Sequence, residues 1–124
     1  MREIKFRAWD LGAESMVDWE SIKLHFSEHI DHEMVVVMQY TGLKDVHGEE
    51  IYEGDILRIS SNFELRKDVQ NQAVEYREGY FHTFEWTLFE LLRNKKVEKQ
   101  TFEVIGNIYE NPELLKGDGE NEGD

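Results

Sequence analysis

The chain has 124 residues, of which 40% are hydrophobic and 12% aromatic, enough to bury one core but not a second. It contains no cysteine, which excludes a disulfide scaffold, a thiolate zinc site and a cysteine nucleophile and is typical of a reducing compartment. The formal net charge of −13 argues against binding to double-stranded DNA, because proteins bind phosphate backbones through Lys and Arg.

The N-terminal part of the chain predicts a hairpin and an irregular segment. Over residues 3–9, apolar and charged side chains alternate, as in a strand with one buried face. Turn-forming residues follow at 10–14, and we expect residues 16–19 to return as the second arm of an N-terminal hairpin. Residues 21–33 are polar and irregular, and are predicted as a strand plus a loop.

The middle of the chain predicts further strands joined by tight turns. Residues 34–38 form a short apolar and β-branched run, which is typical of a strand covered on both faces. Polar residues over 41–50 predict a tight turn that reverses the chain direction, and a second extended segment begins at 51–52. Gly54 predicts a sharp bend, and residues 56–59 continue as a strand.

Beyond residue 60 the pattern becomes less regular. Residues 60–71 are polar with scattered apolar side chains and give no assignment, whereas residues 74–84 predict another hairpin. Thr87 and Glu90 have the spacing of a capping box, in which each side chain bonds a free N–H at the start of a helix. They predict a helix of about two turns that ends at Asn94.

The C-terminal part predicts a closing strand, a second short helix and a tail. The strand covers residues 101–109, and Asn111 and Pro112 have the types preferred at a helix start. Residues 116–124 contain nothing apolar, so we expect a disordered acidic tail after a single domain over 1–115. Because the chain offers neither a signal sequence nor the ~20 apolar residues that cross a bilayer, we expect a cytoplasmic protein without membrane contact.

Three segments of the chain have sequences that are typical of one family. They are MREIKFRAWD (1–10), QYTGLKD (39–45) followed by GEEIYEGDI (48–56), and VIGNIYENPELL (104–115). Their order and wording are similar to the YopX family of phage and prophage proteins of low-GC Gram-positive bacteria. The resemblance implies a phage-encoded, mainly-β domain in the bacterial host, and it implies no defined activity, cofactor or catalytic residue.

Histidines and carboxylates gather between residues 25 and 33, outside these segments. On a helix, His25 and His29 would share a face and bind a divalent metal together with one carboxylate; His32 lies close by. The helical pattern is poor there, however, and the His-Glu-x-x-His sequence of metalloproteases is missing. We therefore favour a solvated polar loop and expect no bound metal and no cofactor.

Glu53 and Asp55 flank Gly54 at the edge of a predicted strand. Paired carboxylates at such a place are able to hold Mg²⁺ or to act as acid and base. A nuclease would add a nearby cation, and Asp55 with Glu75 and Arg77 is the closest approximation in the chain. The structural alternative, which we favour, is that Gly54 makes the turn and Asp55 hydrogen-bonds its own backbone there.

Several aromatic residues in or near predicted strands have the chemistry to stack nucleic-acid bases. Stacking platforms normally come with a basic groove, which this chain lacks, so we favour packing in the core and on the sheets. The residues are Tyr40, Tyr52, Tyr76, Tyr80, Trp86 and Tyr109.

Together these features predict a mainly-β domain, a small SH3-like β-barrel with an N-terminal hairpin and one or two short helices. We predict a protein-interaction module that engages a host or phage protein through an acidic working surface, with candidate binding residues Tyr40, Glu53, Asp55 and Tyr109. The alternative is a metal-dependent enzyme, such as a nuclease, that uses the carboxylates near Asp55. We also expect a homo-oligomer, because edge strands need cover and the run 34–38 is apolar on both faces.

Overall fold

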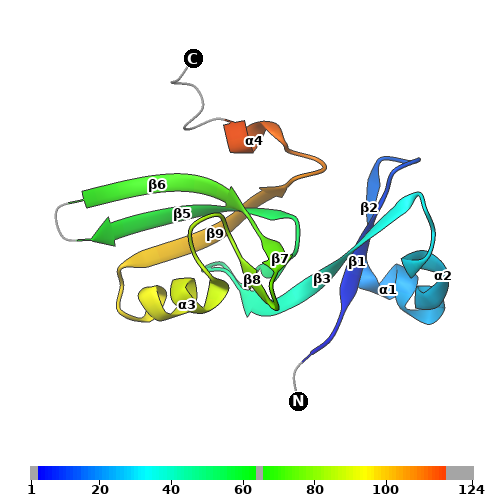
Figure 1. Ribbon diagram of the computed structural model, residues 1–124, viewed down its shortest axis with the longest axis horizontal. Helices are drawn as coiled ribbons and strands as arrows, with labels where there is room; N and C mark the ends of the chain where they lie inside the picture. The colour runs from blue at the N-terminus through cyan, green and yellow to red at the C-terminus, as the bar shows by residue number, and fades with distance from the viewer. Residues whose placement is uncertain (1–2, 64–65, 117–124) are drawn as a thin grey trace.

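The structure, a computed structural model, describes residues 3–63 and 66–116 of the chain, which fold into antiparallel sheets with a few short helices (Figure 1). The strands are β1 (Phe6–Asp10), β2 (Ser15–Val17), β3 (Val35–Lys44), β4 (Glu50–Tyr52), β5 (Asp55–Phe63), β6 (Arg66–Ala73), β7 (Glu75–Arg77), β8 (Tyr80–His82) and β9 (Gln100–Asn107). The helices are α1 (Trp19–Ile22), a 3₁₀ turn η1 (Lys23–His25), α2 (Phe26–Ile30), α3 (Leu88–Lys96) and α4 (Glu113–Lys116).

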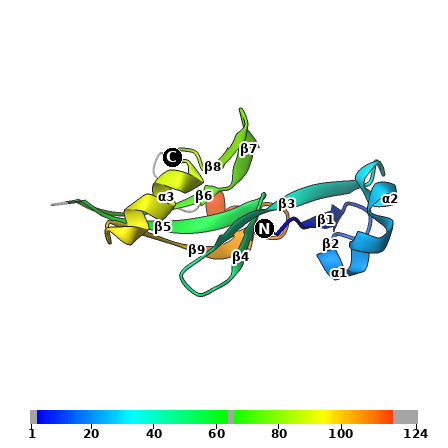
Figure 2. The same cartoon turned by 90° about the horizontal axis from the view of Figure 1, so that it is seen from below.

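The strands are arranged in the orders β2-β1-β3-β4, β6-β5-β9 and β7-β8. The sheets curl strongly, and the long strand β3 runs from the N-terminal body towards the larger C-terminal body (Figures 1 and 2). The mainly-β class and the small β-barrel-like fold predicted from the sequence are therefore confirmed. Within the described residues, no helix is long and apolar enough to span a membrane.

The N-terminal sheet is built around β1. The predicted N-terminal hairpin is confirmed, since β1 pairs with β2, and β1 pairs with β3 on its other side. The prediction of a strand plus a loop over 21–33 is wrong, because α1, η1 and α2 form there and cover one face of the sheet. Asp18 starts the helical segment by accepting the Ser21 N–H at 3.1 Å, and the rings of Trp19 and Phe26 pack around Phe6.

The C-terminal sheet carries the main hydrophobic core. Its buried side chains come from β5 and β9 of this sheet, from β4 of the N-terminal sheet, from α3 and from Val74 between β6 and β7, and α3 covers one side of the sheet (Figure 2). The core residues are Ile51, Leu57, Ile59, Val74, Leu88, Leu91 and Phe102.

The helix α3 begins as the sequence predicts. The Glu90 N–H donates to Thr87 Oγ1 at 3.0 Å, and the Thr87 N–H donates to Glu90 Oε1 at 2.9 Å, which is a complete capping box. The helix continues to Lys96, two residues beyond the predicted end at Asn94. The predicted second short helix is also present as α4, although the Asn111 side chain accepts the Asn107 N–H at the end of β9.

The stretch over 60–71, which the sequence leaves without assignment, belongs to the longest hairpin. Strands β5 and β6 pair from Ile56 opposite Ala73 to Phe63 opposite Arg66. The hairpin predicted over 74–84 is confirmed as β7 and β8. Lys116, the first residue of the predicted acidic tail, belongs to α4. The rest of the predicted tail, from 117 onwards, lies outside the described residues.

Asp45 fixes the turn between β3 and β4 and ties it to β9. Its side chain is 5% exposed, and Oδ1 accepts the N–H groups of His47 and Glu49 at 2.8 and 2.9 Å. Oδ2 accepts the Val104 N–H of β9 at 2.8 Å. Burial acts to raise the pKa of Asp45, but the three N–H donors outweigh it and lower the pKa below its ordinary value.

We expect Asp45→Asn to lower the free energy of unfolding at neutral pH by about 1–3 kcal/mol, because one buried N–H donor loses its acceptor. A folded-state pKa below the unfolded value means that the carboxylate's contribution is present above the unfolded pKa and is lost as the pH falls through the folded pKa. Urea unfolding followed by tryptophan fluorescence should therefore show a shallower acid limb for Asp45→Asn. The exposed Asp31→Asn is the control, and equal acid limbs for all three proteins would contradict this prediction.

Candidate functional site

All four residues predicted as binding residues lie at or next to one face of β1 and the residue before it. This face is opposite the one that packs on the helices, and three of its side chains each contact a predicted residue. The contacting pairs are Lys5 with Tyr40, Arg7 with Asp55, and Trp9 with Tyr109. The alternation over residues 3–9 predicts that Lys5 and Arg7 lie on the solvent-exposed face of the strand. In the structure their side chains are only 16% and 14% exposed.

Arg7 and Asp55 form the central contact of this face. Asp55 is 2% exposed; its Oδ1 accepts Arg7 Nη2 at 2.8 Å, and its Oδ2 accepts the Tyr52 N–H at 2.7 Å. Burial raises the pKa of Asp55, while the Arg7 guanidinium and the Tyr52 N–H oppose that rise. Both carboxylate oxygens are therefore occupied by donors of the chain itself.

Glu53 and Gly54 complete the turn that leads into β5. Glu53 Oε1 accepts the Gln39 N–H at 2.8 Å, and its carbonyl oxygen accepts Arg7 Nη2 at 3.2 Å. Gly54 has a φ of +85°, and a Cβ there would lie 2.9 Å from Met38 Sδ. The two carboxylates that flank Gly54 thus hold a glycine-dependent turn against β1 and β3, as the structural alternative predicts.

A polar cleft of about 390 Å³ lies beside this turn. Three of its charged side chains are paired within the chain, because Glu50 pairs with Lys5 and Arg7 pairs with Asp55, whereas Lys44 and Glu49 belong to none of the ion pairs among the described side chains. The hydrogen bond with Glu50 raises the pKa of Lys5, and burial together with the charge of Glu50 raises the pKa of Tyr52 to about 12. Asp55 and Glu50, the two paired carboxylates of the cleft, are therefore already engaged by cations of the chain itself. The cleft is lined by Arg7, Lys44, Gly48, Glu49, Glu50, Tyr52, Asp55 and Val104.

The structure does not assemble the residues of the nuclease hypothesis into one site. Arg77 Nε lies 3.3 Å from Glu75 Oε1 and donates to His82 Nε2 at 2.9 Å, so its described contacts lie within the β7–β8 hairpin. Asp55 instead contacts Arg7 of β1. The geometry therefore does not favour a carboxylate-based catalytic centre at this turn.

The histidines of residues 25–33 do not gather into one site, although His25 Nδ1 lies 3.9 Å from Glu28 Oε2. His25 lies in η1, His29 in α2, and His32 Nδ1 accepts the Met34 N–H at 3.1 Å. Among residues 3–63 and 66–116, no group of three or more His, Asp or Glu side chains is placed to hold a metal ion.

The aromatic set considered for base stacking divides into residues packed in pairs near β1 and residues of another segment. Tyr40 packs on Tyr52 at 5.4 Å between ring centroids, and Tyr109 stacks on Trp9 at 5.4 Å and 18°. Packing, the role favoured from the sequence, therefore describes these residues. The remaining three, Tyr76, Tyr80 and Trp86, belong to a different part of the molecule, the segment 75–90.

Segment 75–90 exposes large aromatic side chains, of which Tyr80 is a candidate from the sequence and Phe84 and Phe89 are not. Phe84 is 82% exposed and Phe89 is 71% exposed, and Tyr80 is 50% exposed. Acidic residues alternate with them, and a cleft of about 220 Å³ runs between β8 and the start of α3. We give the name hairpin–helix surface to Glu78, Tyr80, Phe84, Glu85 and Glu90, which line this cleft, together with the exposed Phe89 next to Glu90 in the chain. The available signal was the sequence EYREGYFHTFEWTLFE itself, in which aromatic and acidic residues are interspersed without apolar periodicity.

These features define a class of protein, a small β-barrel-like domain whose charged turn is used structurally and whose exposed aromatic residues lie elsewhere. The family model described as YopX protein matches residues 22–116, so the chain belongs to the YopX family, a family of prophage proteins. The resemblance seen in the three sequence segments is therefore confirmed.

The individual relatives agree with this assignment. The chain is 35% identical over 75 residues to the SPbeta prophage-derived protein YopX of Bacillus subtilis, a match that covers 58% of this chain and only 54% of that protein. The crystal structure of protein EF1440 from Enterococcus faecalis aligns with a TM-score of 0.67 and 26% identity, over 93% of this chain and 99% of the other. The crystal structure of yopX from Bacillus subtilis aligns with a TM-score of 0.54 and 22% identity over the same shares, which shows a similar fold.

We expect Asp55→Ala to lower the free energy of unfolding by about 3–5 kcal/mol, because it leaves the Arg7 charge buried without a partner. Asp55→Ala combined with Arg7→Met should cost less than the sum of the two single changes, since the pair is then removed together. The exposed pair of Lys23 and Glu20, at 2.9 Å, supplies the control, and Glu20→Gln should change stability by about 1 kcal/mol or less. Additive effects of the two buried changes in urea unfolding would contradict a coupled pair.

Proposed function

We propose that this prophage protein is a protein-interaction module that acts in the cytoplasm of its bacterial host and binds a basic host or phage protein. The working surface would be the hairpin–helix surface. The observation that carries the proposal is the exposure of Tyr80, Phe84 and Phe89 among acidic residues on one short segment. Large aromatic residues are the commonest energetic anchors of protein interfaces, and they are costly to leave in water without a partner.

The charges of the molecule support a basic partner. Five of the Lys and Arg side chains are engaged by carboxylates in ion pairs, including Arg77, which lines the cleft of the hairpin–helix surface and pairs with Glu75. None of the ion pairs among the described side chains includes Glu78, Glu85 or Glu90. An acidic rim around aromatic anchors attracts a basic partner over long range and repels nucleic acid.

We predict that Phe84→Ser abolishes capture of the partner from host lysate without changing the fold. Truncating an interface anchor typically costs about 2 kcal/mol or more, which is roughly thirtyfold in affinity. Leu24→Ser is the matched control, because Leu24 is 84% exposed on the other body of the molecule. The measurement is a pull-down with quantitative mass spectrometry at low and physiological salt.

A protein that is captured by the wild type and by Leu24→Ser, lost with Phe84→Ser, and reduced by salt would support the proposal. Equal capture by Phe84→Ser and Leu24→Ser would contradict the assignment of the surface. A DNA fragment shifted in a gel at physiological salt would contradict the acidic working surface, and Asp55→Ala with added Mg²⁺ would then test the nuclease alternative.

We also propose that the chain forms a homo-oligomer. The run 34–38 is used largely within the chain, since Met38 is 3% exposed and β3 pairs with β1. Strand β6 gives the better reason to expect an oligomer, because it is an edge strand: the described residues place no strand beyond it. Helix α4 covers this edge near Asn71, whose Nδ2 donates to the Leu114 carbonyl at 3.0 Å. Light scattering at high micromolar concentration should give a multiple of the chain mass of 14.8 kDa, and a monomer mass would refute this expectation.

A further inference from the structure

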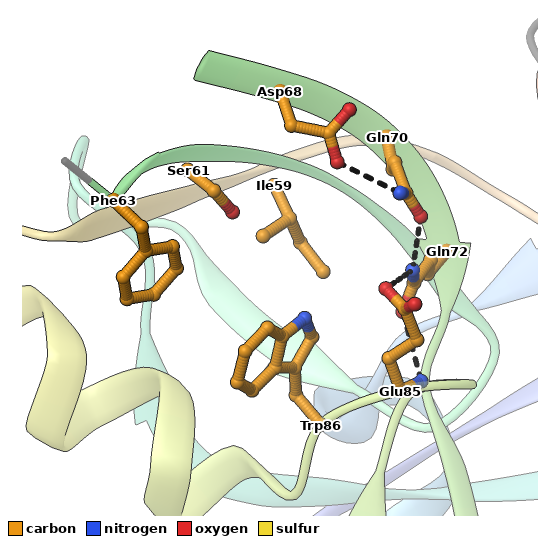
Figure 3. Close-up of a pocket in the computed structure, with 8 residues that line it drawn as sticks. All are labelled: Ile59, Ser61, Phe63, Asp68, Gln70, Gln72, Glu85 and Trp86. Atoms are coloured by element: carbon orange, nitrogen blue, oxygen red, sulfur yellow. Dashed lines mark hydrogen bonds between the residues drawn. The ribbon is translucent and has the colours of Figure 1, made fainter. Parts of the chain in front are cut away.

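A cavity of about 350 Å³ lies on the inner face of the β5–β6 hairpin, next to the hairpin–helix surface (Figure 3). Glu85 and Trp86 line both this cavity and the cleft of that surface, so the two are neighbours. Alternate residues of β5 and β6 point into it, together with the segment that precedes α3. The lining residues are Ile59, Ser61, Phe63, Asp68, Gln70, Gln72, Glu85 and Trp86.

One side of the cavity is an aromatic floor. The rings of Trp86 and Phe63 are nearly parallel, with 6.2 Å between centroids and 15° between planes. Trp86 is held in place by its backbone, since its N–H donates to Thr83 Oγ1 at 3.2 Å and its carbonyl accepts the Thr83 N–H at 2.7 Å. An indole face is the best aromatic partner for a cation.

The other side is a polar wall in which amide groups link two carboxylates. Gln70 Nε2 donates to Asp68 Oδ2 at 2.8 Å, and Gln72 Nε2 donates to Gln70 Oε1 at 2.7 Å and to Glu85 Oε1 at 3.2 Å (Figure 3). The Glu85 N–H returns a bond to Gln72 Oε1 at 3.2 Å. These bonds use both amide donors of Gln72 and one of the two of Gln70 within the wall, and they leave Asp68 Oδ1 and Glu85 Oε2 without a hydrogen bond to a described residue.

The wall contributes two carboxylates to the cavity, those of Asp68 and Glu85. None of the ion pairs among the described side chains includes Asp68 or Glu85. The cavity volume is at the lower end of the about 300–1,000 Å³ of ligand sites, enough for one long side chain rather than a large ligand. A negative wall opposite an indole face is complementary to a flat cation.

The geometry points to this cavity as a receptor for an arginine side chain of the basic protein partner. The guanidinium would stack on Trp86 and donate to Asp68 and Glu85, and the aliphatic stem would pass over Ile59. Arginine fits better than lysine, because a planar fork of donors reaches two carboxylates and stacks on a ring at once, whereas an ammonium is a strongly hydrated point charge. This inference rests on the proposed function and names the side chain that the partner contributes.

Titration of the ¹⁵N-labelled full chain with the peptide acetyl-Gly-Arg-Gly-amide tests it. We expect saturable shifts of the Trp86 indole N–H and of the Gln70 and Gln72 side-chain amides, with the indole signal assigned by its loss in Trp86→Phe. The lysine peptide should bind several-fold more weakly, and the uncharged citrulline peptide should not shift these signals. Asp68→Asn and Glu85→Gln should each weaken arginine binding by about tenfold, the worth of one charge-assisted hydrogen bond.

Glu28→Gln is the control, because it removes the same charge from an exposed position on α2. Equal shifts with the arginine and citrulline peptides, an unchanged affinity in both wall variants, or no shift of these signals at saturating peptide would overturn the inference. Loss of partner capture with Phe84→Ser, but not with Asp68→Asn, would then leave the proposed interaction module standing without the arginine site. If Phe84→Ser also captured the partner, the proposed surface itself would fail.

Discussion

The buried ion pair between Arg7 and Asp55 is the contact on which the arrangement of the two larger sheets depends. Arg7 belongs to the centre of the N-terminal sheet, and Asp55 begins the central strand of the C-terminal sheet. Between them, the Gly54 N–H donates to the Val74 carbonyl at 2.9 Å and its carbonyl accepts the Ile108 N–H at 2.9 Å. A buried pair adds little net stability over an apolar replacement, because both charges must be dehydrated. Its contribution is therefore geometric: it sets how β1 meets β5.

This constraint explains why the most suggestive carboxylates of the chain are poor candidates for chemistry. Asp55 and Glu53 look like a paired acidic site in the sequence, yet each already accepts hydrogen bonds from a neighbouring strand or turn. Groups that hold the fold together are not free to bind a metal or move a proton. Among the described residues, the exposed large aromatic side chains are those of Tyr76, Tyr80, Phe84 and Phe89, and all of them lie on segment 75–90.

Local signals in the sequence predict the parts of the fold that depend on local chemistry. The capping box of Thr87 and Glu90 and the hairpin around β7 and β8 involve residues close in the chain, and both predictions are confirmed. The helices over 19–30 were missed because they are short and are held by tertiary contact, through Phe26 against Phe6 of β1.

The missed parts of the candidate site have a similar cause. In the sequence, Arg7 occupies an exposed position of a strand with alternating apolar and charged residues. Its partner Asp55 is 48 residues away in the chain, so their contact depends on the tertiary fold. Strand β6 was not recognised because period-two apolar alternation is absent from a strand whose inner positions are polar. Those inner residues, Asp68, Gln70 and Gln72, are the same ones that form the wall of the cavity. The polar residues that make β6 hard to recognise as a strand are therefore the same residues that line the cavity.

The polarity of this hairpin is not explained by stability. Gln72 is 6% exposed, and behind the cavity Gln100 is 1% exposed, with its Nε2 donating to Ser61 Oγ at 2.8 Å. Buried amides repay their desolvation only when fully bonded, and well-packed apolar side chains at such positions are usually as stable or more so. Aliphatic side chains at these positions would extend the core of Ile59 and Leu57. With carboxylates and amides against the indole instead, the sheet buries less apolar surface in that region. The same arrangement gives a rigid, negatively charged recess beside exposed aromatic anchors, which is the combination that recognition of a basic protein requires.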